Sequence, residues 1–324
     1  MKKFNAILKK LFILTIVGLG IFSLAACNQE EEIIFGTGDW ESNEFHDEVA
    51  KYIIEEGYGI NARSISADTS ILITSLKSKD IDVAMEIWSD NITSYQDDLD
   101  NNEYVRLSTN FDDNAQGLYI PKYLQEEYPD LKSIQDLPDY AHLFPHPEGG
   151  DKGIIYGGPQ GWSATLFLED KMEAYGLDEH FEFRSIDSNA ILSATIADAF
   201  NNEEPWVGYN WEPTWVMGIY DLVLLEDTPY SESDFQEGKG AFPSVNVDVV
   251  VTNDFETRYP EIATFLSNYE TTSDLTSEAL GYMQNNEATA KETAIWFLKN
   301  NEELWSTWVT SEAKENILNA LENE

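Results

Sequence analysis

Three tryptophans lie close together in the segment EPWVGYNWEPTWVMG, residues 204–218: Trp206, Trp211 and Trp215. The face of an indole ring attracts a cation through the ring quadrupole, and each contact is worth roughly 0.5–2 kcal/mol. A quaternary ammonium group has no N–H to donate, so several ring faces suit both its charge and its apolar methyl surface. Tryptophan is also a large core residue, and for any single ring this alternative stays open. The cluster therefore indicates either a packed core or a cage for a methylated ammonium group.

Further aromatic residues lie at or just beyond the ends of predicted strands: Trp40, Trp88, Trp162 and Trp211. Tyr119 lies within another predicted strand, QGLYIP. In open α/β sheets ligands bind beyond the carboxyl ends of the strands, and junctions between domains are also preferred sites for small ligands. We therefore expect these five aromatic residues to contribute to one ligand site.

A second candidate element is GGPQGWSATLFLE, in which Trp162 and Ser163 stand at the start of a predicted helix. Free backbone N–H groups and the helix dipole make such a position receptive to an anion. A carboxylate could be held by the amides of Ser163 and Ala164 without a basic side chain. The alternative is a plain N-cap by Ser163. An aromatic cage beside a helix N-terminus describes a zwitterion with a methylated ammonium at one end and a carboxylate at the other.

Strands and helices alternate along the chain, and this order predicts an α/β fold with mostly parallel sheets covered by helices. Predicted strands include EIIFGTG, INARSIS and IDVAMEIW, separated by two amphipathic helices, and the last part after residue 256 is mostly helical. At roughly 100–200 residues per domain, the length predicts two domains. We expect one lobe from residues 33–120 plus 241–324, a second from 121–240, and the ligand between them.

The amino terminus has the features of a lipoprotein signal peptide over residues 1–26. Four lysines precede an apolar run over 11–22, which is short for a spanning helix of roughly 20 residues, and the sequence LAAC follows. LAAC resembles the bacterial lipobox, which implies cleavage before Cys27, a lipid on its sulfur, and a tether over 27–32. The alternative is an ordinary signal peptide with an incidental cysteine. Cys27 is the only cysteine, so no disulfide can form within the chain.

The charge is strongly acidic, with 19 basic and 60 acidic residues and a net charge of −41. Removing the leader would leave 15 basic residues against the same 60 acidic ones. No basic patch of useful size remains, which argues against nucleic acid as a partner and against attraction to anionic lipid headgroups. The acidic surface fits a solvated exterior, with weak steering of cationic ligands as the functional alternative.

Enzyme chemistry finds little support. His142 and His146 have the spacing of a metal pair, but prolines break the segment HLFPHPEGGD, so a solvated loop is the better account. No G-x-S-x-G, P-loop or G-x-G-x-x-G motif is present. We expect no metal, no cofactor and no enzymatic activity. A carbohydrate-binding lipoprotein or a secreted glycosidase stays as the second class, because carboxylates are abundant and aromatic platforms also stack sugars.

The segments DIDVAMEIWSDN, NAQGLYIP, GGPQGWSA and PWVGYNWEPTWV together resemble the glycine betaine/choline-type substrate-binding proteins of ABC importers. The resemblance covers essentially the whole chain after the leader. It implies a two-lobed, hinged, periplasmic-binding-protein-like fold of type II, which closes on a quaternary ammonium ligand outside the cytoplasm and delivers it to a membrane permease driven by an ATPase. It also implies an ammonium cage of Trp88, Trp162 and Trp211, joined in choline-binding members by residues matching Trp40 and Tyr119.

The chain departs from that family at one position that contacts the carboxylate of the ligand. Some betaine-binding members carry a histidine four residues after the tryptophan that matches Trp88, whereas this chain has Ile92, with Asn91 beside it. The acids Asp39 and Glu41 near the predicted cage would favour a ligand without a carboxylate. Glycine betaine nevertheless stays the leading ligand, and choline, carnitine or another methylamine is the alternative.

Overall fold

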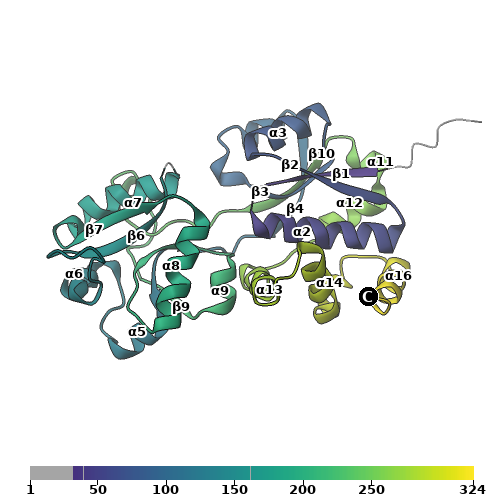
Figure 1. Cartoon of the computed structure of the whole chain (residues 1–324). Helices are drawn as coiled ribbons and strands as arrows, with labels where there is room; N and C mark the ends of the chain where they lie inside the picture. Colours follow the sequence, from purple (N-terminus) through teal and green to yellow (C-terminus); the bar gives the residue numbers. More distant parts are fainter. Residues whose placement is uncertain (1–31, 39, 161) are drawn as a thin grey trace, which may run out of the picture.

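The computed structural model describes residues 32–38, 40–160 and 162–324, and these residues form two lobes joined by two crossing segments (Figure 1). The predicted signal peptide, Cys27 and the tether up to residue 31 lie outside the described residues. Within the described ranges, no helix has both the length and the apolar character needed to cross a membrane.

The first lobe is built on a five-stranded sheet in the order β2-β1-β3-β10-β4. Its strands are β1 (Glu32–Thr37), β2 (Asn61–Ser66), β3 (Val83–Trp88), β4 (Tyr104–Phe111) and β10 (Val247–Thr252). All of β10 and nearly all of β3 are buried, as expected for central strands covered on both faces.

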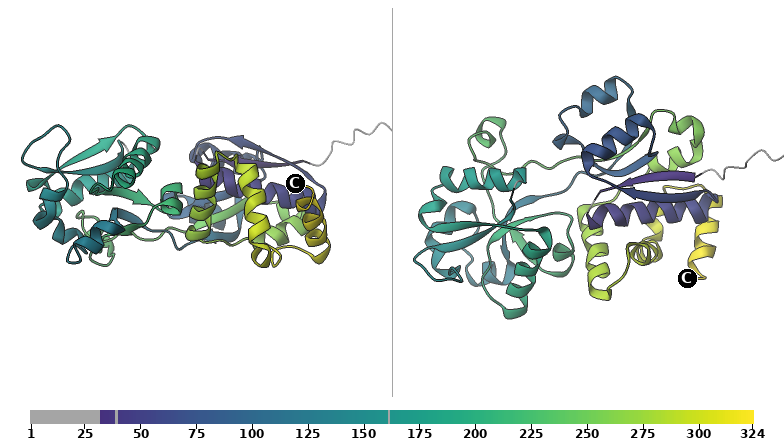
Figure 2. Two further views of the ribbon diagram at one scale, coloured as in Figure 1. Left: turned by 60° about the horizontal axis from the view of Figure 1, so that its bottom comes forward. Right: turned by 45° about the horizontal axis from the view of Figure 1, so that its top comes forward.

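Helices cover both faces of this sheet. One face carries the larger apolar core, to which α2 (Glu41–Tyr52) and the carboxyl-terminal helices contribute, and the opposite face packs on α3 (Thr69–Ser78) (Figure 2). The remaining helices of this lobe are α4 (Tyr95–Asp100), α11 (Phe255–Arg258), α12 (Pro260–Ser267), α13 (Ser273–Asn286), α14 (Ala290–Asn300), α15 (Glu302–Trp305) and α16 (Ser311–Leu321), with short turns η1 (Ile53–Gly57) and η2 (Ser89–Asn91).

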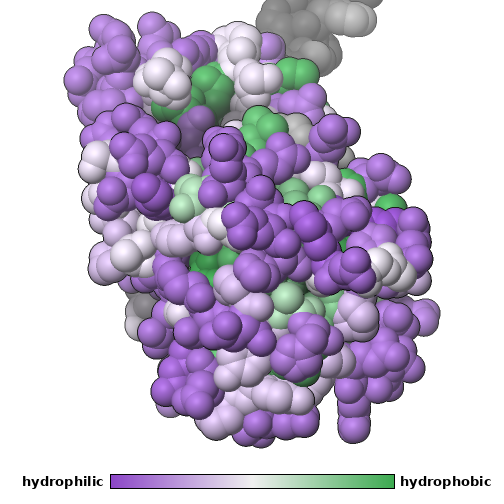
Figure 3. Space-filling model, turned by 90° about the vertical axis from the view of Figure 1, so that its left-hand side faces the viewer, coloured by the Kyte–Doolittle hydropathy of each residue, from purple (hydrophilic) through white to green (hydrophobic). Residues whose placement is uncertain are grey.

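The second lobe repeats the plan with the strand order β7-β6-β8-β5-β9. Its strands are β5 (Gln116–Pro121), β6 (Gly153–Pro159), β7 (Phe181–Ile186), β8 (Gly208–Trp211) and β9 (Leu222–Leu224). Its helices are α5 (Lys122–Glu127), α6 (Leu137–Tyr140), α7 (Ser163–Ala174), α8 (Asn189–Asn202), α9 (Trp215–Ile219) and α10 (Glu232–Phe235), with short turns η3 (Ile134–Asp136), η4 (Ala141–Leu143) and η5 (Leu177–Glu179). The side view toward this lobe is mostly hydrophilic, with scattered apolar residues (Figure 3).

Strand pairing follows the same pattern in both sheets. In the first, β2, β1 and β3 run parallel, and β10 is antiparallel to β3 and β4. In the second, β7, β6 and β8 run parallel, and β5 is antiparallel to β8 and β9. The two-lobed α/β fold of type II is confirmed. Each sheet is mixed, with four strands running in the same direction and one, β10 or β5, running against them, because β5 and β10 each enter from the other lobe.

Three details differ from the sequence-based expectations. The strand β4 has no predicted counterpart. β5 belongs to the second sheet, so the chain crosses between residues 111 and 116 and not after residue 120. The helix α2 begins at Glu41 with Trp40 at its N-cap, although the sequence of this segment offers Ser42 and Asn43 as caps; both lie in the first turn of the helix.

The crossing segments and one pair of helices bring the two lobes into contact. Where the crossing segments run side by side, the amide of Asn114 accepts from the N–H of Val245 at 2.9 Å and donates to its carbonyl at 2.5 Å. Nearby, α9 packs on α13 so closely that a Cβ added at Gly218 would lie 1.9 Å from the carbonyl oxygen of Ser277. Only glycine permits this approach of the two helix backbones.

Candidate functional site

The four predicted tryptophans occupy equivalent positions in the two lobes. Trp40 is the N-cap of α2, which follows β1, and Trp88 ends the neighbouring strand β3. Trp162 is the N-cap of α7, which follows β6, and Trp211 ends the neighbouring strand β8. In each sheet the chain turns in opposite directions from these two strands, so each tryptophan pair flanks the point where the strand order reverses, which is where α/β sheets bind ligands.

Both pairs lie at the seam between the lobes. Trp88 pairs with Val247, the first residue of β10 after the second crossing. Trp211 pairs with Gln116, the first residue of β5 after the first crossing. The carboxyl ends of β3 and β8 are therefore both next to the crossing segments. We call Trp40, Trp88 and their contacts the first half-site, and Trp162, Trp211 and their contacts the second.

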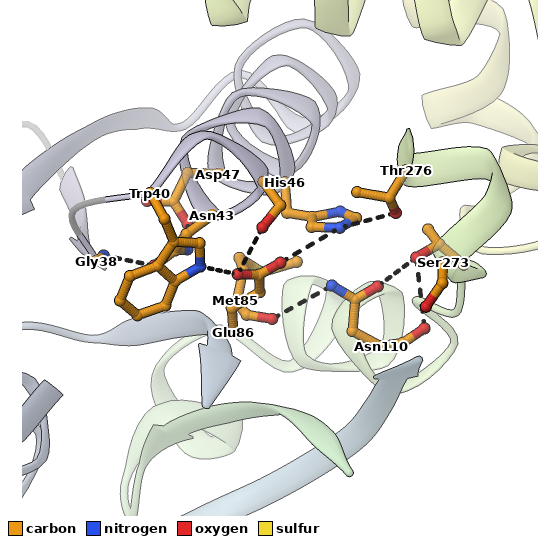
Figure 4. Close-up of polar contacts among 12 residues, drawn as sticks. Gly38, Trp40, Asn43, His46, Asp47, Met85, Glu86, Asn110, Ser273 and Thr276 are labelled. Atoms are coloured by element: carbon orange, nitrogen blue, oxygen red, sulfur yellow. Dashed lines mark hydrogen bonds and ion pairs between the residues drawn. The ribbon is translucent and has the colours of Figure 1, made fainter. Parts of the chain in front are cut away.

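In the first half-site the indole of Trp40 is held at both its face and its edge. A Cβ added at Gly38 would lie 2.2 Å from the ring, so the ring lies across the bare Cα of Gly38. The indole N–H of Trp40 donates to Oε2 of Glu86, which also accepts from Ser42 Oγ at 3.1 Å (Figure 4). Trp88 packs edge-on against Phe111 with 6.0 Å between ring centroids.

Glu86 is the residue that the sequence analysis missed here. Burial raises its pKa to about 7, and hydrogen bonds from the side chains of Trp40, Ser42 and Trp88 act against that rise. Its Oε1 lies 3.8 Å from His46 Nε2, but burial lowers the pKa of His46 to about 3, so at neutral pH the histidine carries no charge. The sequence signal that could have identified Glu86 was the presence of a charged residue inside the apolar run of β3.

The second half-site is built from rings alone. Trp162 lies edge-on to Trp211 with centroids 5.3 Å apart, and Trp211 stacks on Tyr209 at 5.7 Å. Tyr209 is buried, and its hydroxyl donates to Gln116 Oε1 at 2.9 Å. Trp162 is 38% exposed, so this ring is open to solvent. The sequence analysis did not single out Tyr209 or Gln116 as supports of these rings.

The helix N-termini at the two half-sites differ in charge. The first turn of α2 contains Glu41 and Glu44, which neutralise its partial positive charge, whereas the first turn of α7 contains no acidic residue. Ser163 and Ala164 begin α7, and Ser163 is exposed while Ala164 is half-buried. Because the first N–H groups of a helix lack intrahelical acceptors, the α7 end suits an external anion.

Tyr119 differs from the other predicted aromatic residues. Its ring is 1% exposed within the second-lobe core, and its hydroxyl donates to Glu212 Oε1 at 2.9 Å. Burial raises the pKa of Glu212, and the charges of Asp274 and Asp113 raise it further. Tyr119 therefore reaches the seam only through Glu212, and acidic groups from both lobes gather there.

Two cavities, one in each lobe, are lined by none of the tryptophans, although Gln116 lines the one in the second lobe and Phe111 the one in the first. Among the described residues, no group of three or more histidine, cysteine or acidic side chains is arranged to hold a metal ion. The chemistry of the seam is therefore that of aromatic faces, buried acids and one open helix N-terminus.

Two mixed α/β lobes, joined by two crossing segments and with tryptophans at equivalent positions near their seam, have the fold of a two-lobed binding protein of type II. A comparison with family models identifies the kind. The chain belongs to the family described as the substrate binding domain of the ABC-type glycine betaine transport system, whose model matches residues 31–300. The description of this family gives its members a substrate-binding role in transport.

Known proteins are similar to this chain over most of its length. It is 23% identical over 317 residues to a trimethylamine N-oxide-binding protein of Pelagibacter ubique, covering 94% of this chain and 99% of that protein. Among solved structures, the glycine/betaine/L-proline-binding protein ProX of Borrelia burgdorferi matches with a TM-score of 0.63 and 21% identity, covering 89% of this chain and 100% of that one. A choline-binding protein of an ABC transporter, in complex with choline, matches with a TM-score of 0.62 and 20% identity, covering 90% and 98%.

Proposed function

We propose that the chain captures a methylated ammonium solute, with glycine betaine as the leading ligand, between its two half-sites and delivers it to an ABC permease. The observation that carries this proposal is the placement of two tryptophans at equivalent strand ends in each lobe, at the seam. Four ring faces from two hinged bodies can surround a quaternary ammonium group on closure, and each cation–π contact contributes roughly 0.5–2 kcal/mol. Acidic groups at the seam add attraction for a cation.

The two half-sites give the ligand an orientation. Glu86 lies behind the rings of the first half-site, so the ammonium end is expected closer to Trp40 and Trp88. The first turn of α7, free of acids, is expected to accept the carboxylate through the amides of Ser163 and Ala164. Choline is the alternative ligand, favoured by the acids at the seam and by Ile92 in place of a basic residue. The relative from Pelagibacter ubique makes trimethylamine N-oxide a further methylamine to test.

We further propose that the protein works outside the cytoplasm, anchored to the cell membrane by a lipid on Cys27. The LAAC sequence supports this anchor. Metabolic labelling with a fatty acid should mark the wild-type chain and leave Cys27→Ala unmarked. Labelling of both would contradict the proposed anchor.

Calorimetric titration of the unlipidated chain from residue 28 onward with glycine betaine, choline and trimethylamine N-oxide tests the proposed ligand. Saturable heat with at least one of them is expected. Heat with glycine betaine alone would support carboxylate binding at the N-terminus of α7. Heat with choline alone would favour the acidic groups at the seam as the main determinants of binding. The absence of heat with all three would overturn the proposal.

A further inference from the structure

The strand β3 contains an irregularity at the residue that contacts Trp40. Pairing passes from Ile87 opposite Asp248 to Ala84 opposite Val250, so that two residues of β3, Met85 and Glu86, face one residue of β10. This is a β-bulge, a feature that re-aims side chains and is common beside functional sites. Met85 belongs to the core on the α2 face, and Glu86 also turns to that face (Figure 4). The equivalent strand β8 pairs with β5 without a break.

Hydrogen bonds from outside β3 hold the backbone of the bulge. The carbonyl of Met85 accepts from Asn110 Nδ2 at 3.4 Å, and Asn110 Oδ1 accepts from Thr271 Oγ1 at 2.6 Å (Figure 4). Asn110 is fully buried, and Thr271 lies in the segment before α13. Two elements outside the strand thus maintain the conformation that places Glu86 under Trp40.

The two oxygens of the Glu86 carboxylate differ in their partners, and the side chain of Trp88 also lies close enough to favour the charged form. Oε2 accepts from Trp40 and Ser42, whereas Oε1 is buried and lacks a hydrogen-bond partner within the described residues. The titratable groups that face it are His46 and Asp47 from α2 and Tyr269 from the segment before α13. Burial keeps His46 uncharged and raises the pKa of both Asp47 and Tyr269, so none of the three supplies a compensating positive charge at neutral pH.

We propose that Glu86 is a positioning and specificity residue of the first half-site, and that a cationic ligand binds to its ionised form with release of a proton. This inference rests on the proposed function. A carboxylate that accepts the indole N–H fixes the ring across Gly38 and increases the negative potential of its face, because hydrogen-bonded groups polarise one another in a low-dielectric site. A cation at that face favours the charged form of Glu86, and by linkage the ionised form binds the cation more tightly.

The proposal predicts a specific pH dependence. The ligand-free pKa of Glu86 is about 7, so the carboxyl is half-protonated near neutral pH. If binding lowers this pKa by about one unit, affinity rises up to about tenfold between pH 5.5 and 8. Choline and glycine betaine keep their charges over this range, so the change would come from the protein. Calorimetry near pH 7 in buffers of different ionisation enthalpy should also detect fractional proton release.

The variant Glu86→Gln keeps the shape and an oxygen acceptor for Trp40 but cannot ionise. It should bind choline more weakly than wild type at pH 8 and lose both the pH dependence and the proton release. The matched control is Asp248→Asn, a buried carboxylate on β10 that accepts from Tyr95 and Thr109. This control should keep the pH profile of affinity even if stability falls. A wild-type pH profile retained in Glu86→Gln would overturn the proposal.

A measurement without ligand separates this inference from the proposed function. Tryptophan fluorescence of the ligand-free protein should show a transition near pH 7 that disappears in Glu86→Gln, shrinks in Trp40→Phe because Trp88 also interacts with Glu86, and persists in Trp211→Phe. Its presence together with silence toward every methylammonium probe would support the Glu86–Trp40 contact and reject the proposed ligand class. A transition that persists in Glu86→Gln would reject the assignment to Glu86.

Discussion

The two half-sites share one backbone plan and differ in what lies behind the rings. In both lobes a tryptophan caps the helix after the first parallel strand, and a second tryptophan ends the next strand in the sheet. Two residues before that second tryptophan, the first lobe has Glu86 and the second has Tyr209. One half-site therefore places a buried acid behind the rings, and the other places a ring. The comparison teaches that one fold repeated twice can present different electrostatic character at its two half-sites.

The helix N-termini reinforce this difference. Glu41 and Glu44 neutralise the start of α2, whereas α7 starts with exposed Ser163 and no acid in its first turn. An ammonium group is favoured on the first side and an anion on the second. A zwitterion satisfies both sides, and a simple cation satisfies only the first.

The largest effect should come from truncating one tryptophan in each lobe. Trp88→Ala and Trp211→Ala are each expected to weaken ligand binding by at least about 2 kcal/mol, or roughly thirtyfold, because both remove a ring from a desolvated centre. Titration calorimetry measures this. Trp296→Ala, in which the lost ring stacks on Tyr282 in α13, should bind as wild type. If only one of the two substitutions weakened binding, the ligand would contact only the half-site that carries that tryptophan.

A smaller effect is expected from a methyl group added beneath each half-site. Gly38→Ala should displace the Trp40 ring, since its Cβ would lie 2.2 Å from it, and cost about 1–2 kcal/mol of affinity. Gly158→Ala should displace its rings less, because its Cβ would lie 3.2 Å from Tyr209 and 3.5 Å from Trp162; its nearest neighbour would be the hydroxyl of buried Thr165, at 2.9 Å. Equilibrium titrations of both variants give the ranking. The reverse ranking would place the tighter ring packing in the second lobe.

The free energy of unfolding should depend on pH through two buried ionisable groups of the first lobe, His46 and Glu86. His46 has a lowered pKa, so its contribution to the free energy of unfolding is lost as pH falls below about 6.5 toward 3. Glu86 has a raised pKa, so its contribution falls as pH rises from about 4.5 to 7. The two oppose each other between pH 4.5 and 6.5. Glu86→Gln should remove that opposition and make stability rise with pH more steeply there, by about 1.4 kcal/mol per pH unit. Denaturant unfolding at several pH values tests this, and identical slopes would contradict it.

The smallest effect tests the second half-site. Ser163→Asp adds a negative charge to the first turn of α7 and should weaken glycine betaine binding by about 0.3–1 kcal/mol while leaving choline binding unchanged or stronger. Ser163→Asn keeps a polar side chain without charge and is the matched control. Equal weakening of both ligands by Ser163→Asp would show that the carboxylate of betaine lies elsewhere.

Much of this architecture could be predicted from sequence because periodicity and strand-end position are local signals. The strands β1, β3 and β10 are apolar runs, and the four tryptophans stand at their ends or in equivalent places in the second lobe. A charged residue inside the apolar run of β3 was a signal for Glu86, but its contact with Trp40 could not be predicted, because that contact depends on a bulge that appears only when β3 pairs with β10. The crossing at residues 111–116 was missed for a similar reason. QGLYIP reads as a strand in either sheet, and its partner β8 lies about 90 residues later in the chain.

The crossing topology also sets an order of folding during synthesis and export. All five strands of the second lobe lie between residues 116 and 224, so its sheet can assemble as soon as that stretch is available. The first lobe must wait for β10, which fills the place between β3 and β4, and for the carboxyl-terminal helices that cover its larger core. The lobe that begins the chain is therefore the last to be completed, and β1 to β4 remain without their central partner until Thr252 has emerged. A chain threaded across a membrane from its amino terminus would expose the unpaired strand edges and apolar faces of β1 to β4 during this interval. Chaperones outside the cytoplasm would therefore be needed most at that time.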